Sequence, residues 1–343
     1  MGRTTRPRAT LRDIAETTGF STNTVSLALH GSPRLPDETR GVILREAVRL
    51  GYQPNRLARS LASNTSHTSN TSHTIGLLMT DILNPTLTLA AHTIERELSA
   101  AGYAVIFAAS GGSVETERRA LELFQSYRVE GIMVYPAHRQ SLNHVRAVEE
   151  GGTPVLLLVD IHDAGLDVVA VDDEAGACRA LAHLVEAEHR RFAMIDGGYT
   201  FGNRDKFYGA CRALAEAGLP QDALSIYRPE GQSPAFAYDL MARMMAGTAP
   251  TAVFASTDSL GLGVLKWCRE TGDSVPRDLA VIGYDNTEAS EYGALPLSTV
   301  NYAADEISRI GVVRILSRIA AGSGWTGHGR RLIAPDLVIR QTT

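Results

Sequence analysis

Residues 10–29 read TLRDIAETTGFSTNTVSLAL, and this stretch predicts two short helices joined by a tight turn. Its first four residues, TLRD, have the S/T-x-x-acid form of a helix N-terminus, and Gly19 is placed to end the first helix. Ser21 can cap a second helix over 22–29, whose apolar stripe follows i, i+3, i+4 spacing (Val25, Ala28, Leu29). Two short helices separated by a glycine-containing turn are typical of a helix-turn-helix unit.

The residues around this unit carry an excess of positive charge. A third helix is predicted to start at Pro36 and to end at Gly51. Residues 1–62 contain ten Arg against five acidic residues, a balance of +5, whereas the whole chain has a net charge of −5. A basic head on an acidic body indicates a polyanionic partner, so the second helix would enter a DNA major groove. On spacing and charge alone, the alternative is a small helical subdomain that binds a protein.

The run over 10–62 resembles the DNA-binding headpiece of the LacI/GalR family of bacterial transcription repressors. It carries the family-like pieces T-L-x-D-I-A, G-x-S-x-x-T-V-S, G-S-P-R and G-Y-x-P-N-x-x-A-R-S-L in order. The resemblance implies that Thr22 and Asn23 occupy the specificity positions that open the recognition helix. It implies DNA contacts within the headpiece at Thr10, Leu11, Ser21, Thr22, Asn23, Thr24, Ser26, Leu27 and His30.

Two headpiece positions depart from the family. Leu27 stands where the family commonly has Arg, and leucine offers only an apolar contact, for example with a thymine methyl group. We therefore expect the operator to differ at that base pair. His30 replaces the usual Asn after the helix, and its role stays open.

Residues 55–62 resemble the hinge helix of the family. In this interpretation Leu61 is an apolar wedge that enters the minor groove and kinks the duplex. Ordinary packing at a domain junction is the alternative role for Leu61. The resemblance implies hinge contacts with DNA at Asn55, Arg59, Ser60 and Leu61.

Residues 63–74 consist of two copies of the hexad SNTSHT. The segment has no apolar residue, so it cannot offset the entropy of ordering and is predicted to be a flexible linker. Its length exceeds the usual family spacing, and we expect the longer tether to weaken communication between body and head. Two histidines on such a chain, His67 and His73, are not expected to form a metal site.

From residue 75 onward, apolar runs alternate with helical patterns. Strands are predicted at 74–81, 104–110, 131–136 and 154–160, and a second series at 168–173, 191–197, 224–228, 252–258 and 279–286. Nearly continuous apolar strands between helices indicate parallel sheets covered on both faces. We predict a small all-α headpiece (1–54) and an α/β core of two doubly wound lobes, the N-lobe at about 75–171 and 300–325 and the C-lobe at about 172–299 and 326–343.

Several predicted strands end in a polar residue, where open α/β sheets bind ligands. Asp258 is followed at once by a helix and is expected to cap it, whereas loops follow Asp160 and Asp285. The body also resembles the family core, which is similar to periplasmic sugar-binding proteins. The predicted effector-binding set is Asp81, Asp160, Arg204, Lys206, Thr257 and Asp285.

Two further differences from the family lie at the predicted effector-binding site. Lys206 replaces a clamping Arg of the family, and Thr86-Leu87 replaces aromatic residues. Because Lys offers a point charge and Arg a planar fork, this exchange is not conservative. The cleft is expected to hold a small polar effector, a sugar or a derivative. An effector-independent regulator and a soluble sugar-binding receptor are the alternatives.

Other features of the sequence argue against a membrane protein, a secreted protein and several classes of enzyme. No window reaches 18 consecutive apolar residues, no secretory signal is evident, and the three cysteines lack CxxC spacing. Phosphate-loop, GxSxG and HExxH motifs do not occur, so we expect a non-enzyme without metal or cofactor. The expected protein is a cytoplasmic, nucleoid-associated repressor that binds a palindromic operator as a homodimer, with no membrane partner.

Overall fold

The computed structural model describes residues 9–29, 32, 34–52, 72–197, 204–247, 249–325 and 327–343. The chain divides into two compact units, Met1–Ser72 and His73–Thr343, which are described separately. The predicted hinge helix and most of the linker lie outside the described residues. The same holds for five predicted DNA-contacting residues: His30, Asn55, Arg59, Ser60 and Leu61.

The first unit is a three-helix domain, with α1 (Leu11–Thr18), α2 (Thr22–Leu29) and α3 (Asp37–Arg49). Helix α1 starts with a full capping box, because Asp13 N donates to the Thr10 hydroxyl and the Asp13 carboxylate accepts from Thr10 N at 2.7 Å. Gly19 ends the helix with φ 73°, a left-handed conformation that glycine adopts without strain. The predicted helix-turn-helix unit is confirmed. Its core is formed by Ile14, Ala15, Val25, Ala28, Ile43 and Ala47.

The second unit contains two six-stranded sheets, each the centre of one lobe. The N-lobe sheet has the order β11-β5-β4-β3-β1-β2, and the pairs between these neighbours are parallel. Its elements are β1 (Thr74–Met79), α5 (Pro85–Ala100), β2 (Ala104–Ala109), α6 (Val114–Ser126), β3 (Gly131–Val134), α7 (Asn143–Glu150), β4 (Val155–Leu157), β5 (Asp167–Val171), α13 (Ala304–Ala321) and β11 (Arg330–Ile333).

The C-lobe sheet has the order β12-β10-β9-β8-β6-β7, and only the β10–β12 pair is antiparallel. Its elements are α8 (Asp173–Glu186), β6 (Phe192–Ile195), α9 (Arg204–Glu216), β7 (Leu224–Tyr227), α10 (Pro234–Gly247), β8 (Ala252–Ala255), α11 (Asp258–Thr271), β9 (Ala280–Asp285), α12 (Glu288–Tyr292), β10 (Ser298–Asn301) and β12 (Asp336–Val338).

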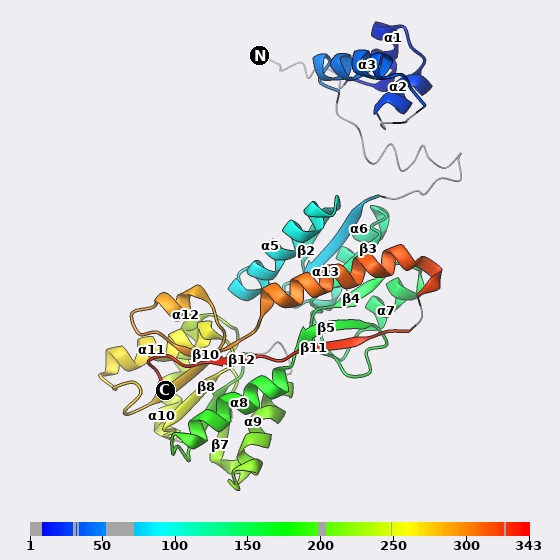
Figure 1. Cartoon of the computed structure of the whole chain (residues 1–343). Helices are drawn as coiled ribbons and strands as arrows, with labels where there is room; N and C mark the ends of the chain where they lie inside the picture. Colours follow the sequence, from blue (N-terminus) through cyan, green and yellow to red (C-terminus); the bar gives the residue numbers. More distant parts are fainter. Residues whose placement is uncertain are drawn as a thin grey trace. The chain divides into compact units, whose positions relative to one another are not determined.

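Helices cover both faces of each sheet, as Figure 1 shows. In the N-lobe, α5 and α13 pack on one face, while α6 and α7 pack on the other. In the C-lobe, α8 and α9 cover one face, and α10 and α11 cover the other. Apart from Thr74 at the start of β1, the central strands β1, β3, β6 and β8 are buried along their length, as the apolar runs predicted. The predicted fold class is confirmed.

The chain passes between the lobes three times, after β5, after β10 and after β11. The third passage differs from the prediction, which assigned all residues after 325 to the C-lobe. Strand β11 pairs in parallel with β5 of the N-lobe, for example Arg330 with Val168, so the chain crosses only at residues 334–335. Three connections that lie far apart in sequence therefore join two lobes whose strand ends face one cleft.

Candidate functional site

Helix α2 exposes the polar side chains of its N-terminal turn. Thr22 and Asn23 are exposed, whereas Val25 on the opposite face is fully buried. The Ser21 hydroxyl accepts from Thr24 N at 3.1 Å and lies 2.8 Å from the Thr24 hydroxyl. Ser21 and Thr24 therefore stabilise the start of the helix, and Thr22 and Asn23 remain accessible to an external partner.

The other predicted headpiece residues differ in their exposure. Thr10 is exposed but its side chain caps α1, and Leu11 is half-buried against the headpiece core. Leu27 and Ser26 are half-buried on α2. Part of the Leu27 side chain thus remains on the surface that carries Thr22 and Asn23.

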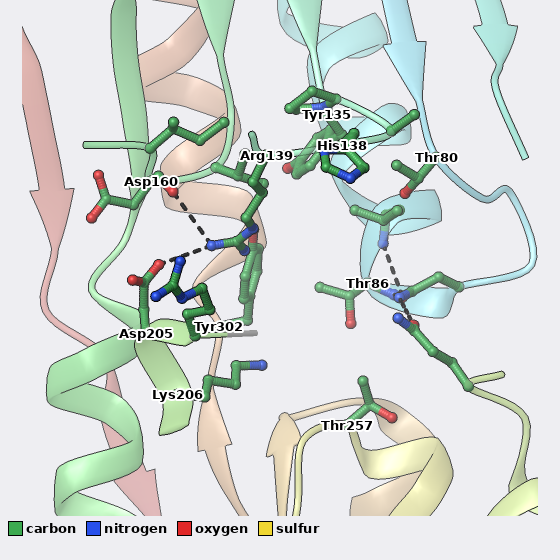
Figure 2. A pocket seen from close by; sticks show the side chains of 18 of the residues that line it. Thr80, Thr86, Tyr135, His138, Arg139, Asp160, Asp205, Lys206, Thr257 and Tyr302 are labelled. Atoms are coloured by element: carbon green, nitrogen blue, oxygen red, sulfur yellow. Dashed lines mark hydrogen bonds and ion pairs between the residues drawn. The ribbon is translucent and has the colours of Figure 1, made fainter. Parts of the chain in front are cut away.

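A cavity of about 490 Å³ lies between the two lobes of the second unit. Figure 2 shows side chains from both lobes around it. The N-lobe contributes residues that follow β1, β3 and β4, and the C-lobe contributes residues from the starts of α9 and α11 and the end of β9. Its polar lining includes Thr80, Asn84, Thr86, Tyr135, His138, Arg139, Gln140, Asp160, His162, Arg204, Asp205, Lys206, Gln232, Thr257, Asp285 and Tyr302.

Helix caps place two of these residues at the cavity wall. The Asn84 side chain accepts from Thr86 N at 2.9 Å at the start of α5, and Pro85 occupies the first helical position. Thr257 caps α11 by accepting from Leu260 N at 3.3 Å. Because parallel strands deliver the chain to helix N-termini at one edge of each sheet, capping residues become cavity residues.

Asp160 is held by Arg330 of β11. The Arg330 Nε and Nη2 atoms donate to the two carboxylate oxygens of Asp160 at 2.6 Å and 2.5 Å. A carboxylate offers about four acceptor positions, so Asp160 can still accept a hydrogen bond from a ligand. Arg330 thereby fixes the orientation of an acceptor in the cavity wall.

Lys206 is a buried cation in the same wall. Its ammonium group donates to the Ser256 carbonyl oxygen at 2.9 Å and lies 3.4 Å from the centroid of the Tyr284 ring. A carboxylate oxygen of Asp173 is 3.8 Å away. Burial raises the pKa of the nearby Asp285, while Lys206 acts in the opposite direction. This end of the cavity thus combines a fixed positive charge with a carboxyl group whose ionisation is disfavoured.

Arg139 contributes a second cation, from the loop after β3. Its Nη1 atom donates to Asp205 of α9 at 2.9 Å and to the Asp160 carbonyl oxygen at 3.3 Å, and its Nη2 atom lies 3.4 Å from Asp173 of α8. These bonds to Asp205 and Asp160 are dashed in Figure 2. One guanidinium group therefore connects the two lobes.

A second cavity of about 720 Å³ adjoins the first and shares Asn84, Gln232 and Thr257 with it. Asn84 Nδ2 of the N-lobe donates to Gln232 Oε1 of the C-lobe at 3.3 Å at this boundary. Asp81 lines the second cavity. Its carboxylate accepts from the Leu83 amide at 2.8 Å, so it also stabilises the loop before α5.

Both units match known protein families. Residues 10–55 match the family described as "Bacterial regulatory proteins, lacI family", and residues 181–343 match the family described as "Periplasmic binding protein-like domain". The chain is 28% identical to the HTH-type transcriptional regulator DegA of Bacillus subtilis (strain 168), with 98% of each protein covered. It is 26% identical to the HTH-type transcriptional repressor PurR of Aliivibrio salmonicida, covering 97% of this chain and 98% of that protein.

Solved structures agree with these matches. A Lac repressor dimer bound to operator and an anti-inducer shares 25% identity and a TM-score of 0.85, covering 98% of this chain and 99% of that one. The chain belongs to the LacI family. It is a DNA-binding transcriptional regulator of that family, with a helix-turn-helix headpiece and a periplasmic-binding-like core.

In this LacI-family regulator, five of the six predicted effector-binding residues line the 490 Å³ cavity, and Asp81 lines the neighbouring cavity instead. Their roles in binding remain predictions. Asp258, expected to cap a helix, is fully buried and accepts from the Thr287 amide at 2.7 Å and the Thr299 hydroxyl at 2.5 Å. It therefore joins α11 to the segments beyond β9.

Several cavity residues were not predicted from the sequence. Arg139 and Tyr135 follow β3 in the run YPAHR, and a polar run after a buried strand was the available signal. Tyr302 follows β10, a short strand that was not predicted, and Gln232 lies in the loop before α10. Arg330 acts on the cavity from a strand that was also missed.

In the described ranges, no group of three His, Cys, Asp or Glu side chains is placed to hold a metal ion. Among the same residues, no helix combines the length and apolar character needed to cross a membrane.

Proposed function

We propose that this regulator represses transcription by binding a palindromic operator as a homodimer, and that a small polar effector in the interlobe cleft, a carbohydrate, controls operator affinity. The observation that carries the proposal is the exposed Thr22-Asn23 turn of α2 within a match to the LacI family headpiece. A helix with short polar side chains at its N-terminal turn is suited to read base edges in a major groove. The Lac repressor, similar over 98% of this chain, is a dimer on its operator.

The size and lining of the cleft are suited to a polar ligand of moderate size. Its lining pairs hydrogen-bonding groups, such as Asp160, Lys206 and Thr257, with apolar surface from Leu87, Val159 and Ile161. Ring hydroxyls can bond to the first set while the face of a ring packs on the second. The effector would change operator affinity by favouring one arrangement of the lobes over another.

Exposed apolar side chains on the N-lobe support dimerisation. Ile82 and Leu83 precede α5, Leu89 lies on α5 and Phe107 lies on the edge strand β2, with exposed fractions of 53%, 84%, 49% and 44%. Exposed large apolar side chains on an edge strand or beside it are a common site of association with a partner. We infer that a second copy of this chain covers them.

The proposal is tested by selecting bound sequences from a random duplex pool with the full-length protein. We expect a palindromic motif with half-sites one or more helical turns apart, and fluorescence anisotropy should then show tight, salt-dependent binding to that motif. Binding that ignores base order at physiological salt would refute the proposal.

Two variants separate base reading from kinking. Asn23→Ala should weaken operator binding by about 1–3 kcal/mol while binding to random duplex is unchanged, because it removes a base contact. Thr17→Ala, on the exposed face of α1, is the matched control.

Leu61→Ala should lose most operator affinity without changing the melting temperature of the core, and equal operator binding by this variant would rule out the wedge.

A further inference from the structure

Arg139 joins the two lobes of the core, which are also linked by the three chain crossovers and by the Asn84–Gln232 hydrogen bond. The residue belongs to the N-lobe, and both acidic partners, Asp205 and Asp173, belong to the C-lobe. Figure 2 shows Arg139 and Asp205 on the side of the cavity opposite Thr86. The contact therefore spans the cleft at one wall.

The two carboxylates are largely shielded from water, and the Arg139 side chain is partly buried. The exposed fractions are 32% for the Arg139 side chain, 17% for Asp205 and 5% for Asp173. Exposed ion pairs contribute little because water and salt screen them, whereas shielded pairs interact more strongly. Burial raises the pKa of Asp205 and Arg139 lowers it, so the carboxylate depends on its cationic partner. Losing either partner would leave a poorly solvated charge.

Both ends of the contact are anchored. On the N-lobe side, the fully buried Glu117 of α6 accepts a hydrogen bond from Ala137 N at 2.6 Å. The other carboxylate oxygen of Glu117 lies 2.6 Å from His144 Nε2 of α7. Glu117 therefore holds the loop that carries Arg139. On the C-lobe side, Asp205 lies in the first turn of α9, which packs closely on α8. Because neither end is a free surface side chain, the bond opposes separation of the lobes.

We propose that Arg139 is an interlobe latch: its bonds to Asp205 and Asp173 hold the cleft closed without ligand, and a ligand with acceptor oxygens releases the latch by taking over the donors of Arg139. The cavity wall includes Arg139 itself, so a bound ligand reaches the same guanidinium group. This proposal rests on the proposed function only for its effect on operator binding.

The expected effect of the latch is that of ordinary allosteric coupling. Allosteric coupling in proteins commonly changes affinity by about 5- to 150-fold. If release of the Arg139 contacts changes the population of closed cores, we expect an effect within this range.

The test uses hydrogen exchange on the full-length, ligand-free protein. Asp205→Asn is isosteric and removes one charge of the latch, and Arg139→Gln removes the other. We expect both variants to speed amide exchange about tenfold in the loop 135–142. The same increase is expected in the segments 84–90 and 257–262, which contain cavity residues away from the latch.

The distant segments distinguish a latch from a local structural role. If Arg139 only stabilised its own loop, exchange would rise at 135–142 alone, and that result would overturn the proposal. The double variant should match the single variants rather than add to them, since each already opens the same contact. Arg139→Lys should restore part of the protection. Lys266→Gln, which removes an exposed ion pair within α11, should change none of these segments.

Operator binding provides a second readout. Asp205→Asn and Arg139→Gln should change ligand-free operator affinity in the same direction, by about 5-fold or more. If the wild-type chain binds its operator but the two variants change operator affinity in opposite directions, or do not change it, the latch proposal is wrong. If the wild-type chain binds no operator while exchange in 84–90 and 257–262 still rises, the latch stands and the proposed function fails.

Discussion

Several side chains in this regulator perform a structural task and line the cleft at the same time. Asn84 caps α5 through Oδ1, which leaves Nδ2 directed at Gln232 across the lobe boundary. Thr257 caps α11, and Asp160 is fixed by Arg330. A polar residue at a strand end thus cannot be assigned to ligand binding from its position alone, because the same position serves helix capping.

The capping box of α1 gives a prediction at the residue scale. Thr10→Ala should destabilise the first helix by about 0.5–2 kcal/mol, because the hydroxyl that accepts from Asp13 N is lost. Faster amide exchange over residues 10–20 would measure this. Thr10→Ser retains a hydroxyl and serves as the control. Equal exchange in Thr10→Ala and the wild-type chain would contradict the prediction.

The same box makes the headpiece sensitive to acid. Hydrogen bonds from the Thr10 backbone amide and hydroxyl lower the pKa of Asp13. A carboxyl group whose pKa is lower in the folded state adds stability above its unfolded pKa and loses it as the pH falls through the folded pKa. Helical circular dichroism should therefore decline from about pH 4 downward, and less steeply in Asp13→Asn.

At the scale of elements, the contact between α8 and α9 depends on a residue without a side chain. A Cβ atom at Gly209 would overlap the carbonyl oxygen of Glu174 in α8. The two helices therefore approach closely, and α9 begins with Arg204, Asp205 and Lys206 at the cavity. The position of these three side chains is set by this packing.

This packing predicts opposite outcomes for two identical substitutions. Gly209→Ala should lower the stability of the core by about 1–3 kcal/mol or more, because the helices must separate. Gly41→Ala in α3 should instead raise headpiece stability by up to about 1 kcal/mol, since its Cβ would meet only the flexible end of Arg45. Urea unfolding of each unit would measure both. A neutral Gly209→Ala would show that the contact can relax.

At the scale of the whole molecule, the proposed dimer face can be tested through Phe107, which does not line the 490 Å³ cavity. Phe107→Glu should convert the proposed dimer to monomers, because it places a charge on the apolar edge of β2. Sedimentation equilibrium would measure the change, and operator affinity should fall with it. Leu123→Glu on α6, at a similar exposed fraction of 47%, is the control and should remain dimeric. A dimeric Phe107→Glu would place the interface elsewhere.

Elements with strong local signals were predicted well. The three headpiece helices and the nine predicted strands all occur, with boundaries that differ by a few residues. Strands β10, β11 and β12 were missed because their polar side chains interrupt any apolar run, whereas the equally short β4 and β8 are wholly apolar. They are strands because neighbouring strands supply hydrogen-bonding partners, which local sequence does not record.

The sequence by itself determined the architecture of this regulator and the set of polar strand ends from which a cleft could be built, since capping, turns and hydrophobic periodicity are local properties. Only the tertiary structure decided which of those groups meet. It placed Arg330 on Asp160, brought Arg139 across to Asp205, and moved Asp81 to a separate cavity. The physical reason is that these contacts join residues 66 to 170 positions apart, and their geometry depends on how two lobes pack around three crossovers.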